Sequence, residues 1–190
     1  IRETLRVQER SAQVSEVGCL GLCYAEPLMD IQVPGGPRVF YGNVDPSMVP
    51  GIVERHLGNG ITDGDFAIAY VGDSNLNGIP HLDDLPMMKG QLRIALRNAG
   101  HIDPGDIYQY IAQGGYAALD MALSELEPEQ VQKQVLDSGL RGRGGAAFPT
   151  GTKWSFLSRS SGPTKYILVN CEEGDPGAFN DKGILESDPH

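Results

Sequence analysis

The stretch Ser138-Gly-Leu-Arg-Gly-Arg-Gly-Gly-Ala-Ala-Phe-Pro-Thr-Gly-Thr-Lys-Trp154 decides how the rest of the sequence is interpreted. Its loop, Gly142 to Ala147, matches the dinucleotide pattern G-x-G-x-x-A, in which glycines let backbone N–H groups approach a phosphate closely. A helix is predicted directly before this loop, and the next strand-like run begins only at Lys165. Because a Rossmann unit places a strand before the loop, the pattern indicates a different nucleotide cradle or, taken alone, a tight surface turn.

The side chains around the loop suit a flat, phosphorylated cofactor. Cations that can pair with phosphate are Arg141, Arg143 and Lys153. Aromatic faces on which a ring can stack are Phe148, Trp154 and Phe156. A flavin or nicotinamide nucleotide needs both kinds of group, so this density favours a binding site over a plain turn.

An acidic segment follows the run from Lys165 to Asn170, which we interpret as a buried strand. The segment reads Asn170-Cys-Glu-Glu-Gly-Asp-Pro-Gly177. Ligands of open α/β sheets bind at the carboxyl ends of strands, where carboxylates can accept hydrogen bonds from ribose hydroxyls or a carboxamide. The alternative is a solvated turn.

The cysteines are too few for a disulfide framework. Cys19 and Cys23 form a C-x-x-x-C pair, and Cys171 stands alone. Thiolates commonly bind iron–sulfur clusters, but such a cluster takes four ligands. The residues by themselves favour a structural or redox-active pair, and the four scattered histidines have no metal-ligand spacing.

Charge and hydropathy exclude several classes of protein. The sequence has 15 basic and 25 acidic residues, a formal net charge of -10, which disfavours nucleic acid and anionic lipid as partners. No apolar run approaches the roughly 20 residues of a membrane span, and residues 1–10 are too charged for a signal peptide. We therefore expect a cytoplasmic protein, peripheral to the inner membrane only through partners.

Local patterns predict the following elements. Strands are expected at 14–19, 29–33 and 38–44, the last two joined by the turn Pro34-Gly-Gly-Pro37. Residues 1–11 are expected to be the end of a helix. Further helices are expected from Asp45-Pro46 until Gly58 and Gly60, at 107–111, at 117–126 and from Pro128 until Gly139. Turn-forming residues at 61–90 predict an extended connector.

The 138–154 stretch and the block Lys165 to His190 resemble the flavoprotein subunit of respiratory complex I and its relatives. Upstream, Gln91-Leu-Arg-Ile-Ala-Leu-Arg-Asn-Ala-Gly100 and the two-cysteine segment resemble forms fused to a thioredoxin-like [2Fe-2S] ferredoxin module. Such forms occur with NAD(P)-reducing or electron-bifurcating hydrogenases and with formate dehydrogenases. The resemblance implies an α/β fold: an incomplete thioredoxin-like module at 1–60, a connector at 61–115, and the N-terminal part of a Rossmann-like FMN-binding domain at 116–190.

The resemblance also implies site residues and cofactors. FMN would be held by Gly142, Arg143, Gly144, Gly145, Lys153, Asn170, Glu172 and Glu173. The nicotinamide nucleotide would face Phe148, Phe156, Glu173 and Asp175. Cys19 and Cys23 would be the second half of a [2Fe-2S] site whose first half lies upstream, and a [4Fe-4S] cluster would belong to a longer chain.

The function implied is that of a diaphorase subunit, which passes electrons between NAD(P)H, FMN and iron–sulfur clusters in a heteromeric complex. Its partners would be ferredoxin-like subunits and hydrogenase or formate dehydrogenase catalytic subunits. The alternative is a docking module that binds no cofactor. One departure is Ala147, where the family usually has Gly. We also expect the sequence to be a fragment, since it stops before the family's second nucleotide loop and cysteine-rich tail.

Overall fold

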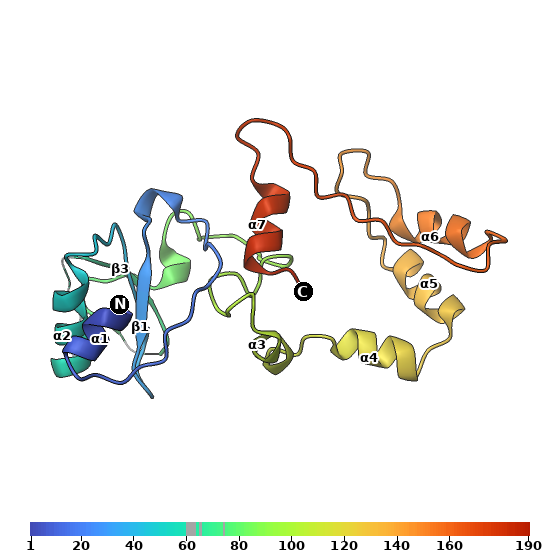
Figure 1. Cartoon of the computed structure of the whole chain (residues 1–190). Coiled ribbons are helices and arrows are strands. Elements are labelled where there is room, and N and C mark those ends of the chain that lie inside the picture. Colours follow the sequence, from blue (N-terminus) through green and yellow to red (C-terminus); the bar gives the residue numbers. More distant parts are fainter. Residues whose placement is uncertain (60–63, 65, 74) are drawn as a thin grey trace. The chain divides into compact units, whose positions relative to one another are not determined.

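The computed structural model describes residues 1–59, 64, 66–73 and 75–190. It divides the chain into two compact units, one of Ile1–Gly105 with Lys182–Pro189 and the other of Asp106–Asp181 with His190. Helices and a sheet are both present, as expected for the α/β class (Figure 1). The functional domain limits given above stay predictions.

The first unit is built on an antiparallel sheet of order β1-β2-β3. Strands β1 (Met29–Gln32) and β2 (Arg38–Tyr41) form the predicted hairpin, with Met29 opposite Tyr41. The tight turn closes through the Gly36 N–H, which donates to the Val33 carbonyl at 2.9 Å. Both strands end earlier than predicted, at Gln32 and Tyr41.

Strand β3 (Ala67–Val71) pairs with β2 and lies inside the segment assigned to a connector. Turn formers on both sides of its five residues conceal it in the sequence. The expected strand at 14–19 is wrong, because no strand is assigned there and the described residues offer this segment no ladder partner. Its last residue, Cys19, donates its N–H to the Ser187 Oγ at 3.1 Å instead.

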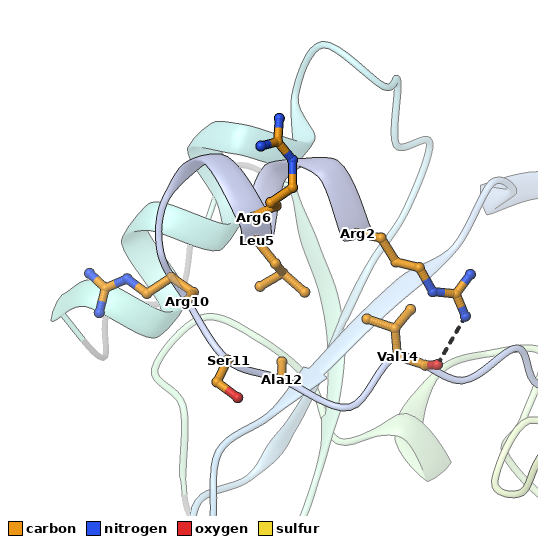
Figure 2. A pocket seen from close by; sticks show the side chains of 7 residues that line it. All are labelled: Arg2, Leu5, Arg6, Arg10, Ser11, Ala12 and Val14. Atoms are coloured by element: carbon orange, nitrogen blue, oxygen red, sulfur yellow. Dashed lines mark hydrogen bonds between the residues drawn. The ribbon is translucent and has the colours of Figure 1, made fainter.

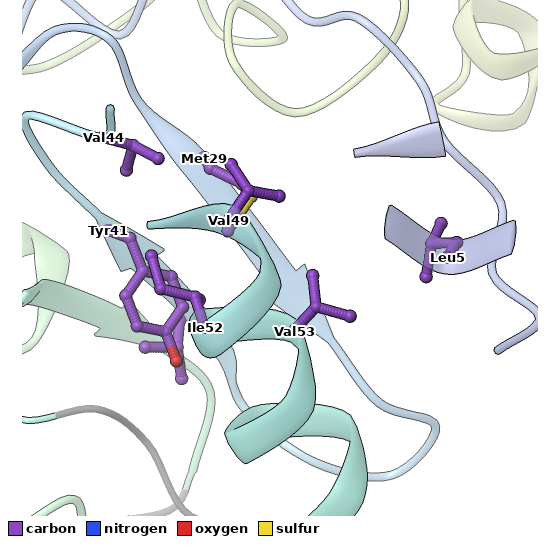
Figure 3. Close-up of a cluster of buried hydrophobic side chains, with 8 residues drawn as sticks. Leu5, Met29, Tyr41, Val44, Val49, Ile52 and Val53 are labelled. Atoms are coloured by element: carbon purple, nitrogen blue, oxygen red, sulfur yellow. The ribbon is translucent and has the colours of Figure 1, made fainter. Parts of the chain in front are cut away.

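Alternation along β2 gives the sheet two buried faces. Val39 and Tyr41 belong to one buried cluster with residues of helix α2 (Val49–Asn59) and with Leu5 of helix α1 (Arg2–Val7). Figure 3 shows Tyr41 of this cluster beside Ile52 of α2. Phe40 points to the opposite face, where it packs with apolar residues of three other segments. These residues are Leu20, Leu22, Ala69, Leu82, Leu85 and Met88. The two-cysteine segment is thus fixed to the face opposite α2.

Helix α2 confirms the predicted apolar face, since Ile52 and Val53 are almost fully buried. It begins at Val49 instead of Asp45, because Asp45 and its neighbours form a turn in which the Asp45 carboxylate accepts the Ser47 N–H at 2.8 Å. The predicted stop at Gly60 and the boundary between residues 60 and 61 lie outside the described residues.

Helices carry the second unit. The predicted helices are present as α3 (Ile107–Ala112), α4 (Ala117–Ser124) and α5 (Pro128–Asp137), followed by two that the sequence patterns did not predict. These are α6 (Thr150–Ser158) and α7 (Asn180–Ser187). Only Asn180 and Asp181 of α7 belong to the second unit, and residues 182–187 belong to the first. Gly139 takes a φ of +68°, consistent with the predicted helix stop.

The buried strand expected at Lys165 to Asn170 is wrong. No strand is assigned there, and Ile167 and Leu168 are each 89% exposed. A strand of this composition needs neighbours on both edges and both faces, and the described residues provide no pairing partner for it.

Candidate functional site

The glycine-rich loop is a closed loop pinned at its base. Arg141 and Pro149 form an antiparallel bridge, the Gly142 N–H donates to the Phe148 carbonyl at 2.8 Å, and the Thr150 N–H donates to the Leu140 carbonyl at 2.9 Å. The Arg141 guanidinium reaches across and donates to the Ala147 carbonyl at 3.1 Å. Arg141 therefore closes the loop.

Inside this closure lies a run of unused backbone donors. Among the described residues, the N–H groups from Arg143 to Phe148 have no hydrogen-bond acceptor, and the loop leads into the N-terminus of α6. Successive N–H groups beside a helix N-terminus are an arrangement that binds anions such as phosphate. The geometry supports the interpretation of this loop as a phosphate cradle.

The loop's glycines have different reasons for being glycine. Gly145 takes a φ of +100°, which favours glycine, whereas a Cβ built on Gly144 would meet no atom within 4 Å and needs no unusual φ. Nothing within the described protein therefore requires glycine at 144. An external group that approaches the backbone would require it.

The predicted aromatic and cationic groups are at the surface. The rings of Phe148 and Phe156 form a pair with centroids 6.3 Å apart, and about half of each side chain is exposed. The side chains of Arg143 and Lys153 are exposed, and no ion pair joins either to another described residue. The structure thus brings Phe148 and Phe156 together and leaves both cations available.

Helix α6 is held by contacts that a local sequence pattern does not show. Gly151 lies against Leu136 of α5 so closely that a Cβ on Gly151 would be 2.3 Å from the Leu136 Cα. At the other end, the Lys165 ammonium donates to the carbonyls of Leu157 and Ser160 at 2.9 and 3.1 Å. The cation therefore caps the C-terminus of α6.

The polar side chains of the acidic segment, residues 170–177, make hydrogen bonds within the segment and to the start of α7. The Asn170 side-chain oxygen accepts the Glu172 N–H at 3.0 Å, which fixes a local turn. The Glu173 carboxylate accepts the N–H groups of Asn180 and Asp181, and so caps the start of α7. Asp175 is exposed on the same segment. Their roles toward a nucleotide stay predictions.

The two-cysteine segment carries a residue that sequence reasoning missed. The Cys19 thiol donates to the Glu26 carboxylate at 3.1 Å, and the ligand atoms of Cys19, Cys23 and Glu26 all lie within 4.8 Å of one another. Partial burial, followed by the hydrogen bond to Glu26, raises the pKa of the Cys19 thiol to about 11. A carboxylate three residues after Cys23 was the available signal.

A separate hollow of about 340 Å³ lies beside helix α1 (Figure 2). Three of its residues are arginines, but their guanidinium groups point in different directions. Arg2 donates to the Val14 carbonyl at 3.3 Å, and Arg6 is paired with Glu3 at 2.6 Å. These cations do not converge on one ligand.

Comparison with known proteins addresses the loop and the acidic segment together. Residues 135–190 match the Nuo51 FMN-binding domain. The match confirms the predicted kinship with the complex I 51 kDa-type flavoprotein over this FMN-binding segment, and it does not extend to the two-cysteine segment.

Three relatives illustrate the range of complexes. An NADH-quinone oxidoreductase subunit of Rhizobium meliloti (strain 1021) is 48% identical over 97 residues, 51% of this chain and 23% of that protein. The NADP-reducing hydrogenase subunit HndC of Solidesulfovibrio fructosivorans is 51% identical over 102 residues, 54% and 20%. The corresponding NADH-quinone oxidoreductase subunit of Aquifex aeolicus (strain VF5) is 44% identical over 99 residues, 52% and 23%. The matched part is thus less than a quarter of each relative.

Among the described residues, no helix has the length and apolar character needed to cross a bilayer.

Proposed function

We propose that this chain supplies the FMN phosphate cradle and part of the nicotinamide nucleotide site of a diaphorase subunit. That subunit would oxidise NAD(P)H, or reduce NAD(P)+, within a heteromeric redox complex. The observation that carries the proposal is the run of unused N–H donors from Arg143 to Phe148, inside the stretch that matches the FMN-binding domain.

The chemistry of the donor set fits FMN. The N–H groups of Gly144 and Gly145 can donate to phosphate oxygens, and the glycine at 144 lets these oxygens come close to the backbone. Arg143 and Lys153 add charge-assisted hydrogen bonds, which are stronger than neutral ones. Gly142, at the base of the loop, keeps its own N–H for closing the loop.

The aromatic pair fits the ring systems. Phe148 and Phe156 present exposed faces beside the cradle, where an isoalloxazine or nicotinamide ring can stack. We assign Asn170, Glu172 and Asp175 to hydrogen bonds with hydroxyl and amide groups of the nucleotides. Glu173 would combine such a contact with its cap on α7.

Bound FMN supplies hydride acceptance at its N5 atom and release of electrons one at a time. The task of this chain's residues is to hold the two rings at reacting distance, which converts an encounter into a positioned reaction. Negative charge on Glu172 and Glu173 disfavours negative charge developing on a nearby flavin. None of these residues has to transfer a proton.

The two-cysteine segment does not complete an iron–sulfur site in this chain. We propose from the resemblance that residues 1–60 correspond to a thioredoxin-like ferredoxin module, which the β1–β2 hairpin followed by α2 supports. A [2Fe-2S] or [4Fe-4S] cluster takes four ligands, and the chain has three cysteines, of which only Cys19 and Cys23 are close in sequence. The available donors do not fit, so no electron-transfer step is assigned to them.

A docking role without cofactor is the second candidate. It is favoured by large apolar side chains exposed on α3 and α4, of which Tyr108 and Leu123 are each 79% exposed. If the chain is part of a diaphorase subunit, the same exposed residues would contact partner redox subunits. Exposed apolar side chains therefore fit both candidate functions, and cofactor binding is what distinguishes them.

Flavin content of the complete gene product separates the two candidates. Arg143→Ala and Lys153→Ala should each weaken FMN binding by about 1.5–3 kcal/mol, roughly 10- to 150-fold in Kd. Lys133→Ala is the matched control, because Lys133 is a surface cation on α5 paired with Asp137. A protein that folds but binds no FMN would support the docking role. Unchanged FMN affinity in both loop variants would refute the assignment of the cradle.

A further inference from the structure

Arg141 lies at the base of the glycine-rich loop and is bound to the loop's own backbone. Its guanidinium donates to the Ala147 carbonyl at 3.1 Å, and its main chain forms the antiparallel bridge with Pro149. The sequence pattern groups Arg141 with Arg143 as a cation for phosphate. The structure separates the two, because within the described residues only Arg141 hydrogen-bonds the loop backbone through its side chain.

The peptide unit that Arg141 holds is the one between Ala147 and Phe148. This peptide is trans, so its C=O and N–H groups point in opposite directions across one rigid plane. A hydrogen bond that holds the Ala147 carbonyl therefore also fixes the direction of the Phe148 N–H. That N–H is the last of the unused donors of the cradle.

A second hydrogen bond holds Phe148 from its other side. The Phe148 carbonyl accepts the Gly142 N–H at 2.8 Å, so the peptide units before and after Phe148 are both fixed from the base of the loop. With its backbone held on both sides, the Phe148 side chain has a fixed starting direction. Its exposed ring pairs with that of Phe156, with centroids 6.3 Å apart.

The loop depends on this support, because it has little of its own. The N–H groups from Arg143 to Phe148 make no hydrogen bond among the described residues, so no internal ladder stabilises the loop. Ala147 takes a φ of +51°, in the left-handed region that an L residue adopts only at a cost in energy. The hydrogen bond from Arg141 to the Ala147 carbonyl offsets part of this cost.

We propose that Arg141 is a positioning residue of the FMN site, which orients the Phe148 N–H and ring for the bound nucleotide without contacting its phosphate. The inference rests on the proposed function above. Donors that are already ordered bind a ligand more tightly, because binding does not have to order them. Arg143 and Lys153 keep the role of direct phosphate contacts, so loss of Arg141 and loss of Arg143 should have different consequences.

Loss of the Arg141 hydrogen bond should leave the FMN-free loop open more often. One such bond changes an equilibrium by about 3- to 10-fold, so the Gly142 and Thr150 N–H groups should exchange faster by that factor in Arg141→Met. FMN association should slow by up to the same factor, because only the closed loop is competent to bind. Arg143→Ala should instead speed FMN dissociation and leave exchange unchanged.

Hydrogen exchange of the FMN-free protein and stopped-flow FMN fluorescence, both on the complete gene product, measure these rates. Arg141→Lys keeps a charged donor, and because Arg141 makes one hydrogen bond to the carbonyl, this variant should restore most of both rates. Arg159→Met is the matched control. It removes the same charge from an exposed arginine at the C-terminal end of α6 and should change neither rate.

Three results would overturn this inference alone. Unchanged exchange in Arg141→Met would mean that the hydrogen bond does not hold the loop. Faster FMN dissociation with normal association in Arg141→Met, as expected for Arg143→Ala, would make Arg141 a direct phosphate contact. Equal defects in Arg141→Lys and Arg141→Met would exclude the hydrogen bond as the cause. Absence of FMN binding by the unaltered protein would overturn the proposed function itself, so the two failures are distinct.

Discussion

The close approach of Gly151 to Leu136 allows a sharp test of how the cradle is supported. A Cβ on Gly151 would lie 2.3, 2.6 and 2.8 Å from the Cα, N and Cβ atoms of Leu136. Carbon atoms in favourable contact are about 3.5–4.0 Å apart, so Gly151→Ala requires a shift of roughly 1 Å or more. Two of the three atoms belong to the backbone, so rotation of a side chain cannot relieve the clash.

The expected magnitude is the difference of two effects. Overpacking of this kind costs about 1–3 kcal/mol, and replacing glycine by alanine inside a helix returns at most about 1 kcal/mol. Gly151 lies in the first turn of α6, where the return is smaller. We expect a net loss of about 1–2 kcal/mol in the α5–α6 contact, with the loop between these helices losing its fixed closure.

Hydrogen exchange measured by mass spectrometry checks this locally. Peptides covering α5 and α6 should exchange about 5- to 30-fold faster in Gly151→Ala, because a loss of 1–2 kcal/mol raises the open population by that factor. Gly144→Ala is the control, since its Cβ would meet nothing within 4 Å. It should leave exchange unchanged and weaken only FMN binding. Unchanged exchange in Gly151→Ala would refute the close packing of the two helices.

Three further changes test other parts of the structure. Ala147 takes a φ of +51°, which costs an L residue about 1–2 kcal/mol, so Ala147→Gly should slow hydrogen exchange of the Gly142 and Thr150 N–H groups, which close the loop. Faster exchange of these two groups would contradict this. Burial lowers the pKa of His56, so its contribution to stability is present above about pH 6.5 and is lost as pH falls through 6.5 toward the lowered value. Between pH 7 and pH 5, urea unfolding should show a smaller loss of unfolding free energy in His56→Gln than in the unaltered protein. The pKa of His101 is also lowered, so protonation of His101 accounts for part of the loss that remains. An equal loss in both proteins would argue against burial of His56 as the cause. Arg38→Met removes an ion pair in which the Arg38 guanidinium donates two hydrogen bonds to the Asp30 carboxylate, at 2.7 and 2.9 Å. The free energy of unfolding measured in urea melts should fall by about 1–3 kcal/mol. An unfolding free energy equal within error to that of the unaltered protein would contradict this.

Elements fixed by local chemistry were predictable from the sequence. The β1–β2 hairpin follows from the turn at Pro34–Pro37, and helix α2 follows from an apolar face whose residues are buried as expected. Helix α5 begins where Pro128 predicts, with Glu127 and Gln130 forming a capping box. In these cases, neighbouring residues supply the stabilising contacts.

Elements fixed by distant contacts were not predictable. Strand β3 exists because β2 offers an edge, and α6 exists despite a sequence of Thr, Gly and Ser that disfavours helix. Conversely, the apolar run from Lys165 has the composition of a buried strand but no partner among the described residues. The spacing of apolar residues shows which side chains a segment can bury. Whether the segment forms a strand depends on a neighbouring strand with which it can pair.

The candidate sites divide in the same way. The glycine loop and its aromatic pair were predictable, because consecutive residues carry both the pattern and the chemistry. Glu26 was missed, because its proximity to Cys19 depends on the turn at Cys23–Ala25 and on the burial of Leu22. A spacing rule for cysteines cannot identify a carboxylate that a turn brings back.

Four glycines of the decisive stretch, Gly139, Gly144, Gly145 and Gly151, are glycine for different reasons, which a motif match merges into one. Gly139 and Gly145 are required by positive φ values, Gly151 is required by the nearness of Leu136, and Gly144 is required by nothing within the described protein. Only the last points outward to a ligand. A conservative substitution at each position should therefore give a different phenotype, in the backbone, in helix packing or in FMN affinity. Of these glycines, Gly144 carries the functional information, because its substitution alone should change affinity without changing the fold.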